Sequence, residues 1–375
     1  MCDVGILTFH CADNFGAMLQ AYGLKTFLRE RNIKADIVPY EPPFMTGRHW
    51  WIPYVPADGW MNIIIRGWNG WRRNLRLGTF FFESRRNMRM FRRKHLIGKE
   101  QRRLLFAGQL RKLSYEYYIV GSDQIWNPEI TLGLRKVYFG DFVGKRKKKV
   151  IAYAASLGRA SLASKYDQEF SELIKAVDCI SVRESAAIPY IRQFCSQEIL
   201  TVPDPVFLLR KEEWEKIEKL PDKKRYVFVY MTEGNDTLAE YAKELARKEG
   251  LSILKVKGGP DLHSENVSVD HTAGPAEFIG YIHGADHVVT NSFHGVAFSI
   301  IFHKDFVAFQ HSSVGARISN ILEMCGLEEN LYREDMEKKA GFQEQERTVD
   351  WDKVEKRIEE EVKAADRYLM NGLKK

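Results

Sequence analysis

The stretch that most constrains the fold runs from Ala285 to Phe302, ADHVVTNSFHGVAFSIIF, because it predicts a strand, a polar turn and a helix in direct succession. His287 to Thr290 form the predicted apolar strand, and Asn291 and Ser292 form the turn. The following residues share helical spacing: Phe293, Val296, Ala297, Ile300 and Ile301. This unit indicates an α/β fold.

Ser292 is a suitable N-cap, which places His294 in the first turn of the predicted helix. The backbone N–H groups and the dipole at a helix start favour an anion, and a partly neutral imidazole there can donate to phosphate or carboxylate. We therefore expect an anion site formed by Asn291, Ser292, His294 and Gly295. A histidine that only packs at a helix start is the open alternative.

Strands and helices alternate in two halves of the chain. Expected strands cover 4–9, 35–40, 117–120, 150–156 and 179–182 in the first half, and 226–230, 251–257, 287–290 and 306–309 in the second. The segments VPDPVFLL and PDKK indicate a crossing between domains. We expect Rossmann-like domains over 1–210 and 221–345 that face each other across a cleft, and a docking helix over 350–372.

Polar residues follow two strands of the first half. After strand 4–9 a helix begins at which Asn14 is the expected cap and Gly16 permits close approach of a ligand. The turn GSDQIWNP follows strand 117–120 and presents Asp123, Gln124, Trp126 and Asn127, where an indole beside polar groups suits a sugar. The alternative is a tight turn whose tryptophan is folded into the core.

One arginine is a candidate anion contact. Arg183 directly follows strand 179–182, where its planar guanidinium can grip a carboxylate or phosphate at two points. Its neighbour Glu184 supplies the alternative of a structural ion pair. Arg317 lies in the helix after strand 306–309. The run KRKKK at 145–149 fits a solvated turn better than a ligand site.

Residues 41–112 interrupt the alternation with tryptophan, phenylalanine and isoleucine interleaved with arginine. This pattern is typical of a helix in a lipid interface, so we expect the segment at about 60–112 to contact an anionic membrane surface. An insertion with internally packed tryptophans and a solvated arginine face is the second interpretation. An RNA-binding stripe is the third, but no known nucleic-acid module accompanies it, so we expect no nucleic-acid partner.

Composition sets outer limits. Five scattered cysteines without metal-ligand spacing indicate neither a disulfide framework nor a zinc site, which fits a reducing cytoplasm. No secretion signal and no membrane-spanning run is apparent, so we expect a cytoplasmic protein, peripheral at the inner face of the membrane if the insertion binds lipid. The excess of 57 basic over 50 acidic residues is mild.

The chain resembles the polysaccharide pyruvyl transferase family. The matching motifs are VGILTFHCADNFGAMLQAYGL, YIVGSDQIWNP, VIAYAASLG, CISVRES, VPDPVFLL and VTNSFHGVAFSIIF, in family order. The resemblance implies a GT-B-like arrangement of two Rossmann-like domains. It also implies transfer of the enolpyruvyl unit of phosphoenolpyruvate to two hydroxyls of a sugar, giving a pyruvate ketal and phosphate.

In that family an arginine after the ISVR strand and a histidine in the HG turn lie at the donor site, which corresponds here to Arg183 and His294. We expect His294 to act as general acid and base and Arg183 to bind the donor, the two converging on one phosphoenolpyruvate. No cofactor or metal is expected beyond this co-substrate. The chain departs from the family at Ser292, where family members commonly have an arginine. In the region after the next strand, where they tend to have a lysine, this chain has Arg317.

Three functions remain in competition at this point. The first is a pyruvyl transferase that acts on a cell-surface polysaccharide or its lipid-linked or nucleotide-linked precursor. The second is a glycosyltransferase of the same architecture with a nucleotide-sugar donor. The third is a homologue that binds glycan or membrane and has lost catalysis. The sequence gives no expectation for the sugar, the lipid carrier or the oligomeric state.

Overall fold

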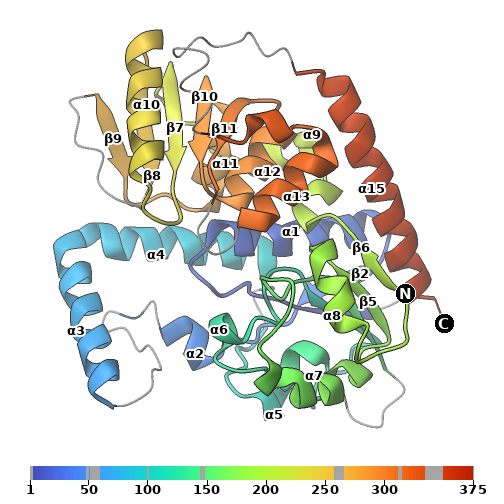
Figure 1. The fold of residues 1–375 in the computed structure, drawn as a ribbon. Coiled ribbons are helices and arrows are strands. Elements are labelled where there is room, and N and C mark those ends of the chain that lie inside the picture. The colour runs from blue at the N-terminus through green and yellow to red at the C-terminus, as the bar shows by residue number, and fades with distance from the viewer. Residues whose placement is uncertain are drawn as a thin grey trace. The chain divides into compact units, whose positions relative to one another are not determined.

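Two compact units make up the chain in a computed structural model (Figure 1), one of 1–209 with 364–375 and one of 210–363. The structure describes residues 3–47, 50, 60–98, 101–143, 148–256, 266–310, 315–333 and 349–374. Within these ranges no helix is both long and apolar enough to cross a bilayer. The run KRKKK at 145–149, expected to form a solvated turn, lies mostly outside the described residues.

The N-terminal unit is built on a parallel six-stranded sheet of order β2-β1-β3-β4-β5-β6. The central strands of this sheet are apolar and largely buried, as parallel strands covered on both faces must be. The six strands are β1 (Asp3–Leu7), β2 (Lys34–Ile37), β3 (Tyr117–Gly121), β4 (Lys149–Ala155), β5 (Cys179–Val182) and β6 (Ile199–Thr201).

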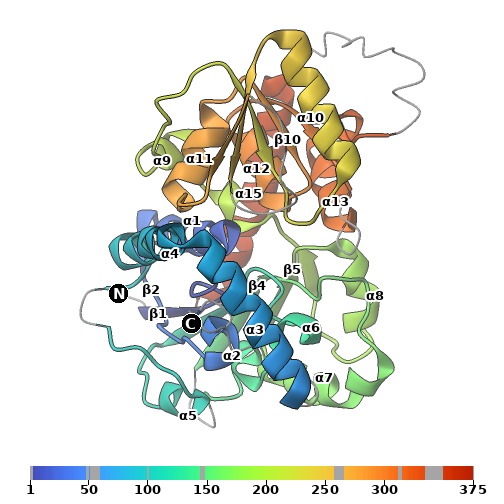
Figure 2. The same cartoon turned by 90° about the vertical axis from the view of Figure 1, so that its left-hand side faces the viewer.

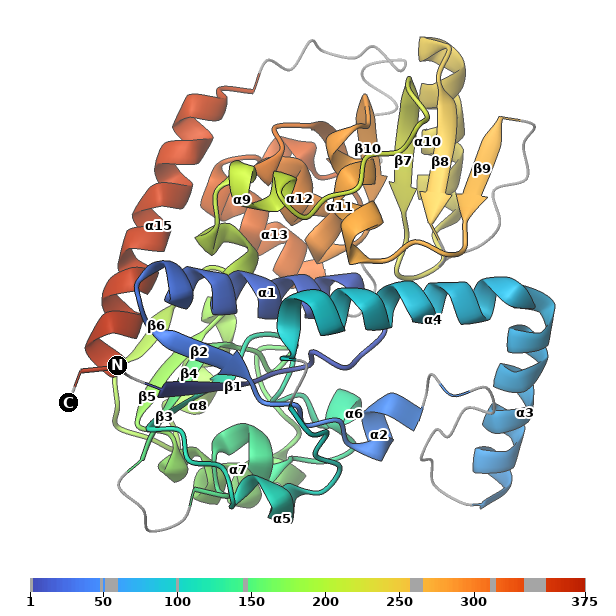
Figure 3. The ribbon, with the colours of Figure 1, turned by 180° about the vertical axis from the view of Figure 1, so that it is seen from behind.

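Helices cover both faces of this sheet. Figure 3 shows α1 (Phe15–Glu30) on one face and α7 (Asp167–Leu173) on the other. Asn14 caps α1 by accepting a hydrogen bond from the Ala17 N–H at 3.0 Å, as expected. The shorter helices are α2 (Pro43–Thr46), α5 (Ala107–Leu110), α6 (Pro128–Thr131) and α8 (Ile188–Ile191).

The interruption between β2 and β3 contains two long helices, α3 (Trp60–Leu77) and α4 (Thr79–Phe91), followed by one π-helical turn, Arg92–Leu96. The end of this segment packs on α1, where Lys25 Nζ donates to the carbonyls of His95 and Leu96 at 3.0 and 2.6 Å. Met88, Phe91 and Leu96 are buried there. The C-terminal part of the insertion is therefore fastened to the N-terminal unit.

The C-terminal unit has a parallel five-stranded sheet of order β11-β10-β7-β8-β9. The strands are β7 (Tyr226–Tyr230), β8 (Ser252–Val256), β9 (Val267–Asp270), β10 (His287–Thr290) and β11 (Asp305–Ala308). One face of the sheet packs on α10 (Asp236–Glu249) (Figure 2). The other face packs on α11 (Pro275–His283) and α12 (Phe293–Ile301), with Phe228 of the sheet in contact with Phe278 of α11. The unit also contains α9 (Lys211–Glu215) and α13 (Gly315–Cys325).

The last helix, α15 (Trp351–Gly372), contributes to both units. In the C-terminal unit, the Trp351 ring stacks on His303 at 4.7 Å and Val354 is buried. In the N-terminal unit, Ala365 and Leu369 are buried and the Tyr368 hydroxyl donates to the Ala152 carbonyl at 2.8 Å. The buried residues Val354, Ala365 and Leu369 are eleven and four residues apart, a spacing that places them on one side of the helix.

The two parallel sheets confirm the expected α/β fold with two Rossmann-like domains. Most predicted strands agree with the observed ones to within about two residues, but β6 and β9 were missed. Both are short edge strands, and their residues are mostly exposed or half-buried, so neither shows the buried apolar run used to recognise strands. That the domains face each other across a cleft stays a prediction.

Candidate functional site

Each sheet has one point where the strand order reverses, which is where open α/β sheets bind ligands. In the N-terminal sheet this point lies between β1 and β3, and in the C-terminal sheet it lies between β7 and β10. The residues that follow these strands at their carboxyl ends include Thr8, Asp123, Thr232 and Asn291. Each unit thus has its own candidate site, and we describe them separately.

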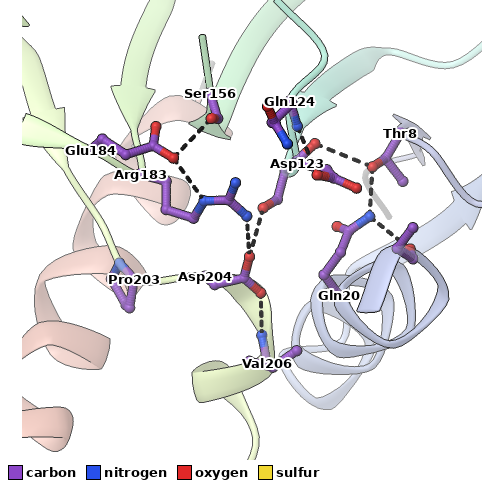
Figure 4. Close-up of polar contacts among 12 residues, drawn as sticks. Thr8, Gln20, Asp123, Gln124, Ser156, Arg183, Glu184, Pro203, Asp204 and Val206 are labelled. Atoms are coloured by element: carbon purple, nitrogen blue, oxygen red, sulfur yellow. Dashed lines mark hydrogen bonds and ion pairs between the residues drawn. The ribbon is translucent and has the colours of Figure 1, made fainter. Parts of the chain in front are cut away.

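A chain of hydrogen bonds crosses the N-terminal switch point (Figure 4). Gln20 Nε2, on α1, donates to Thr8 Oγ1 at 2.7 Å, and Thr8 Oγ1 donates to the Ser122 carbonyl at 3.4 Å. The Ser122 hydroxyl in turn donates to Asp204 Oδ2 at 3.2 Å. These side chains, all buried, link the ends of β1 and β3 to the segment after β6.

Arg183 lies between two carboxylates (Figure 4). Its Nε donates to Glu184 Oε1 at 3.2 Å and one terminal nitrogen donates to Asp204 Oδ2 at 2.8 Å. Burial alone would lower the pKa of Arg183, but Glu184, Asp204 and Asp123 together raise it, so the guanidinium stays charged. The ion pair weighed as an alternative is therefore present, and donor binding by Arg183 stays a prediction.

Glu184 uses only one of its two carboxylate oxygens in these contacts. Oε1 accepts from the Ser156 hydroxyl at 2.8 Å as well as from Arg183. Oε2 is buried and has no hydrogen-bond partner among the described residues. Three carboxylates, those of Asp123, Glu184 and Asp204, surround one guanidinium, so this edge suits hydroxyl groups better than a small anion.

The turn after β3 only partly matches its prediction. Asp123 has φ of +67° and its Oδ1 accepts from the Gln124 N–H at 2.8 Å. Gln124 and Asp123 are half-buried, whereas Asn127 is buried, caps α6 and donates to Gln124 Oε1 at 2.8 Å. Gly158 lies against this pair, because a Cβ there would be 2.2 Å from Gln124 Oε1.

Trp126 is not a sugar platform, and that expectation was wrong. Trp126 is 0% exposed, and the centroid of its ring lies 5.2 Å from that of Phe139, on which it stacks. Its indole N–H donates to the Tyr138 carbonyl at 2.9 Å. Both ring face and N–H are thus used inside the core. The alternative of a tryptophan folded into the core is what the structure has.

Asn14 and Gly16 lie at the start of α1. Asn14 is exposed but its side-chain oxygen is used as the cap, and Gly16 is buried in the first turn. No contact of either residue indicates a ligand, so their part in acceptor binding stays a prediction.

A second buried polar group lies beside the N-terminal switch point and was missed from the sequence. His10 is 0% exposed, its Nδ1 lies 3.2 Å from the Thr8 carbonyl, and its Nε2 has no hydrogen-bond partner among the described residues. Burial, with the charge of Arg92, lowers the pKa of His10 to about 3. Arg92 itself lies 3.7 Å from the buried Glu41 carboxylate.

The C-terminal switch point is tied together by Asn291. Its Oδ1 accepts from the Thr232 N–H at 2.8 Å, and its Nδ2 donates to the Glu233 carbonyl at 3.0 Å. These bonds join the loop after β7 to the end of β10. Thr290 completes the join, because its hydroxyl donates to the Tyr230 carbonyl at 2.6 Å. Asn291 therefore shapes the site, and direct contact with a ligand stays a prediction.

Ser292 caps α12 as predicted, accepting from the Gly295 N–H at 3.4 Å, and His294 lies in the first turn. Gly295 allows α12 to start close to β10, since a Cβ there would be 2.4 Å from Thr290 Oγ1. His294 is largely buried, at 9% exposed, with its ring edge-to-face on Phe293 at 5.1 Å. Arg317 is half-buried on α13.

Most missed residues had a signal in the sequence. Thr8, Ser156 and Glu184 each come within two residues of the end of a predicted strand, where parallel sheets gather ligand-binding groups. Asp204 and Gln20 had no such signal, because their partners lie far away in sequence. Among the described residues, no group of three or more His, Cys, Asp or Glu side chains is placed to hold a metal ion.

Comparison with known proteins gave one family and several distant structures. A family model described as polysaccharide pyruvyl transferase matches residues 14–313. No curated protein matches the sequence.

Similar solved structures include UDP-GlcNAc 2-epimerase of Methanocaldococcus jannaschii with UDP-GlcNAc and UDP. It has 12% identity and a TM-score of 0.47, and the match covers 96% of this chain and 92% of that one. A heptosyltransferase of E. coli with ADP has 12% identity, TM-score 0.38 and coverage of 84% and 90%. A Streptomyces sp. glycosyltransferase has 12% identity, TM-score 0.41 and coverage of 99% for both chains.

Proposed function

The chain belongs to the polysaccharide pyruvyl transferase family, and we propose that it transfers the enolpyruvyl unit of phosphoenolpyruvate to a glycan as a pyruvate ketal, releasing phosphate. The acceptor would be a sugar of a cell-surface polysaccharide or of its lipid-linked precursor. The observation that carries the proposal is the position of His294, in the first turn of α12 at the switch point of the C-terminal sheet.

The donor fits the start of α12. Phosphoenolpyruvate is small and carries a phosphate and a carboxylate, and a helix N-terminus presents backbone N–H groups and positive dipole charge to such an anion. His294 adds an imidazole at the same place, and Arg317 on α13 is the proposed additional cation. Ser292 keeps the helix start defined, although it adds no charge where family members often have arginine.

The proposed reaction uses His294 first as an acid. The imidazolium protonates the methylene carbon of the donor, the adjacent carbon becomes oxocarbenium-like, and one sugar hydroxyl adds to it after losing its proton to a base. The second hydroxyl then forms the other C–O bond as the C–O bond to phosphate breaks. One hydroxyl proton restores the imidazolium and the other leaves with phosphate, so the proton count balances.

The acceptor fits the N-terminal switch point. Glu184 Oε2 is buried, lacks a hydrogen-bond partner among the described residues and lies on a carboxylate that Arg183 and Ser156 hold in place. A sugar hydroxyl is the group that such an oxygen accepts from, so we assign Glu184 as the base for the acceptor. Asp123 and Gln124 are the proposed further contacts to the sugar.

The expectation that His294 and Arg183 converge on one phosphoenolpyruvate, with Arg183 binding this donor, stays a prediction. Within the N-terminal site its contacts give it a defined position: it orients Glu184 and balances the charge of Asp204.

The test is release of phosphate from phosphoenolpyruvate in the presence of a panel of glycans. Wild-type protein should release phosphate with at least one acceptor, and His294→Ala should lower the rate by about 10²–10⁴-fold, the contribution typical of a general acid or base. His287→Ala is the matched control, because His287 lies at the amino end of the same strand, β10. Equal rates for the wild type and His294→Ala would remove His294 from the mechanism.

Two competing functions give different results in the same experiment. A glycosyltransferase would be protected against thermal unfolding by a nucleoside diphosphate and not by phosphoenolpyruvate. A homologue without catalysis would bind glycan and release no phosphate. Phosphate release that persists in a chelator would match the expectation that no metal or other cofactor takes part. The cytoplasmic location remains a prediction.

A further inference from the structure

Two helices of the N-terminal unit form an arm that the proposed function does not use. The α3–α4 arm consists of Trp60–Leu77 and Thr79–Phe91, joined at Gly78, and Figures 1 and 3 show α3 at the outer end of α4, away from the N-terminal sheet. The C-terminal part of α4 is held on the unit by buried side chains and by an Arg85–Asp13 ion pair at 3.9 Å. The outer helix α3 has no such set of buried anchors among its described side chains; Asn74 and Gly67 are its two buried residues.

One face of α3 is apolar and exposed. Five large side chains on it are between 47% and 61% exposed, and their spacing of three, four or seven residues places them on one side of the helix: Met61, Ile64, Ile65, Trp68 and Leu75. Gly67 and Asn74 lie on another side, which packs inward, and Asn74 donates to the Trp50 carbonyl at 3.2 Å. The second interpretation, an insertion with internally packed tryptophans, is therefore wrong for Trp68, which is 56% exposed.

Cations accompany the apolar face, and one of them, Arg72, lies on it, four residues after Trp68 and three before Leu75. Residues 60–98 contain ten Lys and Arg against a single acid, Glu83. On α3 itself Arg66, Arg72, Arg73 and Arg76 are all exposed and carry no opposing acid on the helix. Exposed aliphatic and indole groups next to arginines match the boundary between lipid headgroups and acyl chains, where the apolar groups are buried and the guanidinium groups reach anionic headgroups.

We infer that the α3–α4 arm binds an anionic membrane surface, with α3 lying in the headgroup region and its Met61–Leu75 face toward the acyl chains. A second copy of the chain is disfavoured as the occupant of this face, because two arms would bring seven cations against seven. Nucleic acid would match the arginines but leaves the exposed methionine, isoleucines and leucine unexplained.

The test uses the full chain in co-sedimentation with phosphatidylcholine vesicles prepared with and without phosphatidylglycerol. Wild-type protein should bind only the vesicles that contain phosphatidylglycerol, and added salt should weaken the binding. Ile64→Ser combined with Trp68→Ser should weaken binding at least about tenfold, since both side chains lose their apolar contact. Arg72→Gln combined with Arg73→Gln should also weaken it about tenfold.

Matched controls lie in the other unit. Leu220→Ser changes an apolar side chain that is 55% exposed, and Arg247→Gln changes an exposed arginine on α10; neither should alter vesicle binding. Because the changed side chains of the arm are exposed, circular dichroism melts should match the wild type. No donor or glycan is present, so this outcome does not depend on the proposed enzymatic function.

Three results would overturn the inference. The first is equal vesicle binding by wild-type and arm variants. The second is no vesicle binding together with a dimer that the Ile64→Ser, Trp68→Ser variant dissociates, which would assign the face to a second copy. The third is arm-dependent binding of RNA without vesicle binding, which would assign it to nucleic acid.

Discussion

The buried group of Arg183, Glu184 and Asp204 is the residue-level feature on which the acceptor site depends. A buried ion pair contributes little net stability because of its desolvation cost, but removing one partner leaves an uncompensated charge. Here Asp204 also caps the segment Pro205–Leu208 through the Val206 N–H at 3.1 Å, whereas Glu184 keeps one oxygen for other contacts. Substitution of Glu184 should therefore mainly lower activity, whereas substitution of Asp204 should mainly lower stability.

Glu184→Gln tests the assigned base. The amide preserves size and can still accept from Ser156, and Arg183 retains Asp204, so the protein should fold with a modest loss of stability. Phosphate release should fall by about 10²-fold or more in kcat while the KM for phosphoenolpyruvate changes little. Asp204→Asn is the comparison, and there the larger effect should be a lower thermal midpoint. Wild-type kcat in Glu184→Gln would show that the carboxylate is not the base.

His10 predicts a dependence of stability on pH. Its pKa of about 3 in the folded protein lies below the ordinary value of 6.5, so between these values the unfolded chain binds a proton that the folded protein does not. Stability from this residue is present in full above pH 6.5 and is lost as the pH falls, by on the order of 1 kcal/mol per pH unit.

The measurement is denaturant unfolding of wild type and His10→Asn at several pH values from neutral to mildly acidic. Other titrating groups are shared, so their contributions cancel in the difference. The loss of unfolding free energy on acidification should be smaller in the variant. Parallel pH curves for the two proteins would mean that folding does not lower the pKa of His10.

At the scale of elements, the strand β10 and the helix α12 can pack closely because residue 295 is a glycine. Gly295→Ala would place a Cβ 2.4 Å from Thr290 Oγ1, so α12 must move away from β10, at a cost of about 1–3 kcal/mol. The same shift displaces His294, so phosphate release should also fall. Gly108→Ala on α5 is the control, since no atom lies within 4 Å of a Cβ there, and it should be neutral or slightly stabilising.

On the scale of the whole molecule, α15 fastens to both units with different residues. Leu369 is fully buried within the N-terminal unit, so Leu369→Ala should cost about 2–5 kcal/mol. Hydrogen exchange should rise mainly in the N-terminal sheet. Val354→Ala should instead raise exchange in the C-terminal unit, and Leu373→Ala, at a half-buried site, should do little. Equal increases in both units after Leu369→Ala would mean that the two units unfold together.

The amino-acid sequence determined the elements and the residues at their ends. The apolar runs that became β1, β3, β4, β5, β7 and β10 were readable because a strand covered on both faces is apolar throughout. The caps Asn14 and Ser292 and the first-turn position of His294 were readable because capping depends on neighbours within three residues. The exposed apolar and basic character of α3 was also present in the sequence pattern.

Only the tertiary structure decided which side chains meet. Ser122 and Asp204 are 82 residues apart, Arg183 and Asp204 are 21 apart, and local periodicity carries no information about such pairs. The same limit explains Trp126, whose sequence position fits either a sugar platform or a core residue. In the structure its ring stacks on Phe139 and its N–H donates to the Tyr138 carbonyl, so it is a core residue. Local pattern fixes burial and element type, whereas contacts at long separation depend on how the strands are ordered in the sheet.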